Sequence, residues 1–104
     1  MAYDLHTGIS RRQQQYRLSL TEDLHDELFS MIRSQGLSLP VTMKLADYYQ
    51  DKHLPCELHL RWREELNFLL SQPLSTALDQ TLHQMIAVLQ QAMNDDLSIY
   101  WFAD

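Results

Sequence analysis

The spacing of apolar residues predicts four helices, over 21–34, 41–51, 56–71 and 75–94. The pattern is most regular in the last segment, where apolar residues recur at steps of four and three and the opposite face is polar. Ser19 or Thr21 can cap the first helix, and Ser75 or Thr76 the last. Because so short a repeat does not support a free-standing coiled coil, the last helix is expected to pack against the third in a small bundle.

The two ends of the chain lack helical periodicity. Residues 1–20 are expected to form an irregular arm that ends in a short extended piece. The β-branched and aromatic residues of 97–104 predict an extended tail, which can pair with 16–20 and close the domain. The predicted fold class is therefore all-α, a single compact four-helix domain over 1–104 with a short two-stranded pairing of arm and tail. Its expected core consists of Leu24, Leu28, Leu45, Trp62, Leu66, Leu69, Leu82, Met85 and Leu89.

Composition agrees with one globular domain. Of 104 residues, 45% are hydrophobic and 21% are charged, which suffices to build a core. The net charge of −6 disfavours binding to nucleic acid, whose phosphates attract basic proteins. Cys56 is the only cysteine, so no intrachain disulfide can form, which is typical of the reducing cytoplasm. No export signal follows Arg11 and Arg12, and no apolar run approaches the ~20 residues that span a membrane.

No motif in the chain predicts catalysis, a metal or a cofactor. Helices that bind metals carry ligands three or four residues apart, and the five histidines include no such pair. Cys56 lies near a predicted helix start, but no family signature surrounds it. Adjacent acids on a helix point about 100° apart. Three acidic pairs are therefore interpreted as solvated surfaces: Asp26 and Glu27, Glu64 and Glu65, and Asp95 and Asp96.

The uneven distribution of charge predicts a surface for a basic protein partner. Residues 1–20 carry three Arg and one Asp, whereas 74–104 carry four Asp and no Lys or Arg. Asp95 and Asp96 stand at a predicted helix C-terminus, where the helix dipole disfavours acids, so local stability does not explain them. Acids beside aromatic residues, here and in 47–51, are typical of interface hot spots. The predicted partner-binding residues are Asp95, Asp96, Tyr100, Trp101 and Asp104.

Three short segments resemble small bacterial immunity proteins of toxin systems: MAYDL at 1–5, LADYYQD at 45–51 and IYWFAD at 99–104. The resemblance implies a cytosolic, non-enzymatic, helical protein that binds and blocks a cognate toxin. A net charge of −6 suits such a role, because electrostatic attraction speeds association with a basic toxin domain.

Two alternatives stay open, a homodimeric helical adaptor and a small ligand-binding bundle. A dimer requires an exposed apolar patch on one helix. A ligand-binding or catalytic protein requires a deep pocket that gathers two or more of five side chains. These are His25, His53, His59, His83 and Cys56.

Overall fold

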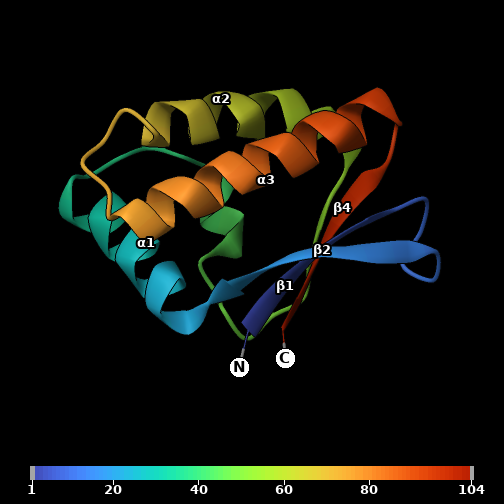
Figure 1. Cartoon of the computed structure of the whole chain (residues 1–104), viewed down its shortest axis with the longest axis horizontal. Coiled ribbons are helices and arrows are strands. Elements are labelled where there is room, and N and C mark those ends of the chain that lie inside the picture. The colour runs from blue at the N-terminus through green and yellow to red at the C-terminus, as the bar shows by residue number, and fades with distance from the viewer. Residues whose placement is uncertain (1, 104) are drawn as a thin grey trace.

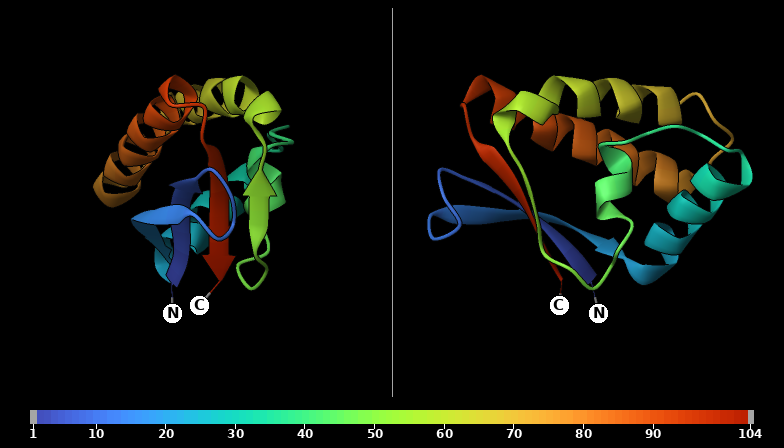
Figure 2. Two further views of the ribbon diagram at one scale, coloured as in Figure 1. Left: turned by 90° about the vertical axis from the view of Figure 1, so that its right-hand side faces the viewer. Right: turned by 180° about the vertical axis from the view of Figure 1, so that it is seen from behind.

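The computed structural model describes residues 2–103 and has an α+β fold (Figure 1). The elements in chain order are β1 (Ala2–Gly8), β2 (Gln14–Thr21), α1 (Glu22–Ser34), the 3-10 helix η1 (Thr42–Leu45), β3 (Lys52–Leu54), the 3-10 helix η2 (Cys56–Leu58), α2 (His59–Leu69), α3 (Thr76–Asn94) and β4 (Ser98–Ala103). The strands form one antiparallel sheet in the order β2-β1-β4-β3. On one side of this sheet, α3 packs across β2, β1 and β4, with α2 beside it and α1 against β2 (Figure 2).

The predicted all-α class is wrong, because residues 1–20 form a β-hairpin rather than an irregular arm. Tyr3 and Leu5 of β1 face the helices and pair with Leu20 and Leu18 of β2. Polar residues alternate with them and point to the other side of the sheet. Gly8 is needed where the hairpin closes, since a Cβ there would lie 2.1 Å from the Gln13 carbonyl oxygen. Each strand thus buries only a few apolar residues, which leaves a weak pattern in the sequence.

The C-terminal tail is extended and pairs with the N-terminal arm, as predicted, but it pairs with 2–8 rather than with 16–20. Residues Ser98–Ala103 form β4 at the centre of the sheet, between β1 and β3. The strand β1 therefore separates β4 from 16–20. Leu5 lies opposite Trp101 in this register, and both are buried, so the two ends of the chain contribute paired residues to the core. The N- and C-terminal ends lie near each other (Figure 1).

The predicted helix over 41–51 is also wrong. Only η1 forms there, and the chain then continues to β3. A continuing α-helix would join the Tyr49 N–H to the Leu45 carbonyl. Both groups have other partners: the Leu45 oxygen accepts from His25 Nε2 at 2.9 Å, and the Tyr49 N–H donates to the Asp47 carboxylate at 3.0 Å. Side chains thus replace the helical hydrogen bond.

The remaining helix predictions agree with the structure. The Thr21 hydroxyl accepts from the Leu24 N–H and caps α1, and the Ser75 hydroxyl accepts from the Leu78 N–H and caps α3. The predicted helix over 56–71 begins as η2 and continues as α2. Leu24 is half-buried against the core, and the other eight predicted core residues are buried. No helix within residues 2–103 is long and apolar enough to cross a membrane.

Candidate functional site

The structure does not gather the predicted partner-binding residues into one exposed surface. Asp95 and Asp96 are exposed at the end of α3. Trp101 has no exposed surface because it faces the helices. Tyr100 points to the opposite side of the sheet, where only 8% of its surface is exposed. Asp104 lies outside the described residues. Among the four predicted residues that lie within 2–103, only Asp95 and Asp96 are well exposed to a partner.

The backbone at Asp96 is strained. Its φ is +53°, in the left-handed region that favours glycine, and Gly36 occupies the matching place after α1 with a φ of +62°. The Leu97 N–H donates to the Ala92 carbonyl at 2.9 Å, which closes the helix end. The helix dipole and the backbone angle both disfavour an aspartate at this position.

We expect Asp96→Gly to raise the free energy of unfolding by about 0.5–1 kcal/mol, because glycine adopts this backbone without strain and removes the unfavourable charge. Asp96→Asn should give part of this gain by removing the charge alone. Urea unfolding followed by circular dichroism measures both variants. A loss of stability in Asp96→Gly would mean that the carboxylate itself stabilises the end of α3.

Tyr100 belongs to a row of rings that crosses the sheet on the face turned away from the helices. The His53 ring stacks on Tyr100 with centroids 4.7 Å apart, and the Phe102 ring lies parallel to Tyr100 at 6.1 Å. The His6 ring meets Phe102 edge-on at 4.9 Å and Tyr16 at 5.6 Å. Such contacts between strands stabilise the sheet and leave little of Tyr100 for a partner.

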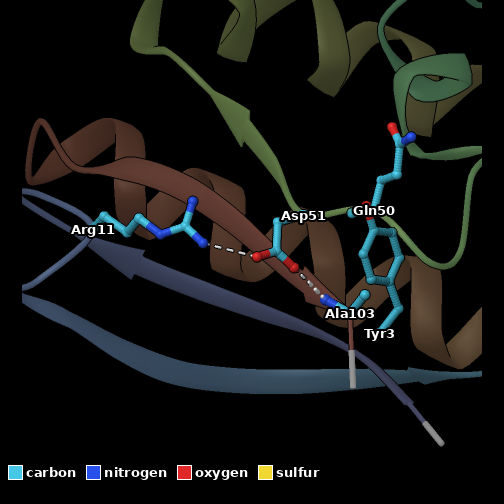
Figure 3. A network of polar contacts seen from close by, with 5 residues as sticks. All are labelled: Tyr3, Arg11, Gln50, Asp51 and Ala103. Carbon is cyan, nitrogen blue, oxygen red and sulfur yellow. Dashed lines mark hydrogen bonds and ion pairs between the residues drawn. The ribbon is translucent and has the colours of Figure 1, made fainter.

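Arg11 and Asp51 tie the hairpin to the C-terminal strand (Figure 3). The Arg11 guanidinium donates to one Asp51 oxygen at 2.8 Å, and the Ala103 N–H donates to the other at 2.9 Å. The Tyr3 hydroxyl donates to the Gln50 carbonyl at 2.6 Å. Burial, and secondly the nearby acids including Asp51, raises the pKa of Tyr3 far above its ordinary value. This network has its donors and acceptors matched, which is typical of a structural role.

A shallow hollow of about 160 Å³ gathers Cys56, His59 and Asp96. Two of its residues belong to the five whose convergence would indicate catalysis or ligand binding. His59 is 2% exposed and its Nε2 donates to the Leu54 carbonyl at 3.3 Å, while burial lowers its pKa. The Cys56 thiol donates to the Leu97 carbonyl at 3.6 Å. Backbone carbonyls thus hold the two groups, so the geometry gives no nucleophile and base in contact.

A larger pocket, of about 330 Å³, lies between α1 and the segment 46–49 that follows η1. We call it the α1 pocket. Residues 46–49 form one wall, and the other wall consists of Glu22, His25, Asp26, Phe29 and Arg33. The pocket exists because the chain leaves the helical path after Leu45, which brings 46–49 against α1.

His25 forms the buried part of the α1 pocket. It is 4% exposed, and its ring lies 4.5 Å from Phe29 and 4.8 Å from Tyr48 between centroids. Since a carbonyl only accepts, the Nε2 atom that contacts the Leu45 oxygen carries the hydrogen. In the neutral ring the other nitrogen, Nδ1, is then an acceptor. Nδ1 has no hydrogen-bond partner within residues 2–103, and it is not among the buried unpartnered atoms, so it keeps some accessible surface on a side chain that lines the pocket.

The rim of the α1 pocket is acidic. Glu22, Asp26 and Asp47 are exposed, and none of them forms an ion pair within residues 2–103. Arg33 is the basic residue of the lining, and it also lacks an ion pair there. Three acids and one base give a charge of −2 with His25 neutral. Tyr49 stands beside this rim with 66% of its surface exposed.

The helix α1, which forms one wall of the α1 pocket, lies near the N-terminal end of α3, whereas Asp95 and Asp96 follow its C-terminal end (Figure 1). Ser75, at the start of α3, donates to the Glu27 carboxylate of α1 from its N–H at 3.1 Å and its hydroxyl at 2.7 Å. The two acidic surfaces are thus separated by a helix of 19 residues, about 28 Å long. This distance exceeds the Debye length of about 8 Å at physiological salt, so the charges of one surface hardly affect a group bound at the other.

The chain was compared with protein-family models, with curated proteins and with solved structures, and none matches. Within the described residues, no three His, Cys, Asp or Glu side chains gather in a way that could hold a metal ion. The absence of a catalytic or metal centre stays a prediction from the sequence.

Proposed function

We propose that this protein is a non-enzymatic binder of a basic protein, of the kind that immunity proteins exemplify, and that the α1 pocket is its contact surface. One observation carries the proposal. Three exposed carboxylates without ion pairs, Glu22, Asp26 and Asp47, surround a pocket beside an exposed tyrosine. Tyrosine is one of the residues enriched in interface hot spots, and unpaired carboxylates complement the charge of a basic partner.

The net charge of −6 supports the same role. A basic partner would approach faster than a neutral one, because the field of the whole protein attracts it before contact. A cytoplasmic location is part of this proposal. It rests on Cys56, an exposed and unpaired thiol of the kind that persists in a reducing compartment.

The test requires a partner, and the first candidate is the product of the gene adjacent to the one that encodes this chain. Co-expression should protect cells from that product if it is a toxin. Binding kinetics are then compared for two variants that each remove two negative charges, Asp26→Asn with Asp47→Asn and Asp95→Asn with Asp96→Asn. Both should slow association, and the effect should shrink at high salt.

Only the pocket variant should also speed dissociation, by about tenfold or more, because it removes short-range contacts. Asp47→Asn retains the oxygen that accepts the Tyr49 N–H, so the fold of this wall is kept. If the Asp95 and Asp96 variant dissociates faster and the pocket variant does not, the contact surface is the C-terminal end of α3. If neither variant changes binding, the proposal of an acidic interface is wrong.

A homodimer is the competing account. Leu60 and Phe68 are 51% and 45% exposed on α2, two turns apart, with the exposed acid Glu64 between them. This interruption divides the apolar surface that a dimer would use. Light scattering on the free protein decides between the two, since a binder that acts alone should have the mass of one chain.

A further inference from the structure

We propose that the α1 pocket accepts the guanidinium group of an arginine side chain from the partner protein. This inference rests on the proposed function and adds the chemical group that is recognised.

The buried part of the pocket contains a hydrogen-bond acceptor without a partner. His25 is more than nine-tenths buried, and its Nε2 is held by the Leu45 carbonyl. The Nδ1 atom of this pocket-lining ring is accessible, has no partner within residues 2–103 and, in the neutral ring, presents a lone pair. This atom is separate from the acidic rim, but like the rim carboxylates it accepts a hydrogen bond. A ligand must therefore present N–H groups both to the rim and at depth.

The walls of the pocket favour a flat cation. Tyr49 is 66% exposed, and its ring lies nearly perpendicular to that of the buried Tyr48, with centroids 5.7 Å apart. Of the two rings, that of Tyr49 offers an accessible aromatic surface beside the pocket. A guanidinium group stacks on aromatic faces and carries five N–H donors in one plane. An ammonium group offers three donors around one point and is held more tightly by water. Arginine therefore suits this lining better than lysine.

The net negative charge of the pocket lining favours the binding of a cation. Glu22, Asp26 and Asp47 contribute three negative charges, and Arg33 contributes one positive charge. A guanidinium group from a partner would reduce the net charge from −2 to −1. Arg33 opposes its entry as a like charge, which gives a variant expected to improve binding.

The test uses two blocked tripeptides as probes, acetyl-Gly-Arg-Gly-amide and acetyl-Gly-Lys-Gly-amide, titrated into the ¹⁵N-labelled protein at pH 8. We expect the arginine probe to shift the His25 ring nitrogens and the amides of 46–49, but not those of Asp95 and Asp96. Its Kd should be at least about fivefold lower than that of the lysine probe, the ratio given by one additional hydrogen bond.

Variants of exposed residues test the same site without disturbing the core. Asp26→Asn with Asp47→Asn should weaken binding of the arginine probe by about tenfold or more, whereas Arg33→Gln should strengthen it. The matched control, Asp95→Asn with Asp96→Asn, should leave the Kd within about twofold, because it lies beyond the screening length. Equal binding of the two probes, or shifts confined to the C-terminal end of α3, would overturn the inference. The inference would also be overturned if the shifts caused by the arginine probe did not saturate at probe concentrations up to about 50 mM, because such binding is too weak for a specific site.

The inference and the proposed function can fail separately. If the partner binds through the pocket but the arginine and lysine probes bind alike, only the arginine assignment is wrong. If the arginine probe binds as expected but the protein partner ignores the pocket variants, the pocket is a guanidinium site and the proposed contact surface is wrong.

Discussion

Replacing Trp101 by alanine should lower the free energy of unfolding by about 3–5 kcal/mol. Trp101 has no exposed surface, and its ring lies 5.1 Å from Tyr3 and 6.3 Å from Trp62 between centroids. It stands in the central strand β4, so its loss leaves a cavity where the sheet meets the helices. Small domains are stable by only about 5–15 kcal/mol, so this single change removes a large part of the stability.

Trp101→Phe provides the matched control. Phenylalanine keeps an aromatic ring in the core and removes the indole N–H, which has no hydrogen-bond partner among residues 2–103. We expect this variant to lose less than half as much stability as Trp101→Ala, because most of the apolar contact remains. Urea unfolding followed by circular dichroism measures both. A midpoint in Trp101→Ala that equals that of the unchanged protein would contradict the placement of Trp101 in the core.

This prediction also bears on partner binding. The sequence assigned Trp101 to a partner surface because an aromatic residue next to acids is typical of a hot spot. The same residue pattern also describes an inner strand whose alternate residues are apolar, and here that is what forms. A loss of binding in Trp101→Ala would therefore accompany unfolding, and only a variant that stays folded can identify the contact surface.

The sequence predicted those elements whose stability is local. The helices that begin after Thr21 and Ser75 have a capping hydroxyl, acids in the first turn and a long periodic face, and all of these act within a few residues. The hairpin of 1–20 lacks such signals. Its strands gain stability from β4 and α3, which lie 55 or more residues away in the chain, so a local pattern cannot reveal these contacts.

The α1 pocket was missed for a related reason. Asp47, Tyr48 and Tyr49 stood out as acids beside aromatic residues, but a predicted helix over 41–51 would have carried them away from α1. Asp26 was interpreted, together with Glu27, as part of a solvated surface. The pocket depends on the hydrogen bond from His25 to the Leu45 carbonyl, which ends η1. No pattern in the sequence pairs two residues that are 20 apart in this way.

Glu65 is another residue whose role the sequence concealed, and it carries the second large prediction. The pair Glu64 and Glu65 was interpreted as a solvated surface, but Glu65 is only 5% exposed. Its two carboxylate oxygens accept the N–H groups of Val41 at 3.1 Å and Thr42 at 2.8 Å. A side chain of α2 thus holds the start of η1 and, through it, the segment that forms the wall of the α1 pocket.

We expect Glu65→Ala to lower the free energy of unfolding by about 2–4 kcal/mol, because two buried N–H groups lose their acceptor. Glu65→Gln keeps one acceptor oxygen and should cost about half as much. Glu64→Ala is the matched control on the exposed neighbour and should change stability by less than about 0.5 kcal/mol. Urea unfolding gives these values, and hydrogen exchange at Val41 and Thr42 should quicken in the Glu65 variants alone.

Since η1 positions 46–49, Glu65→Ala should also weaken binding of the arginine probe while the folded sheet persists. Stability and exchange in Glu65→Ala that match Glu64→Ala would show that the start of η1 is held by other contacts.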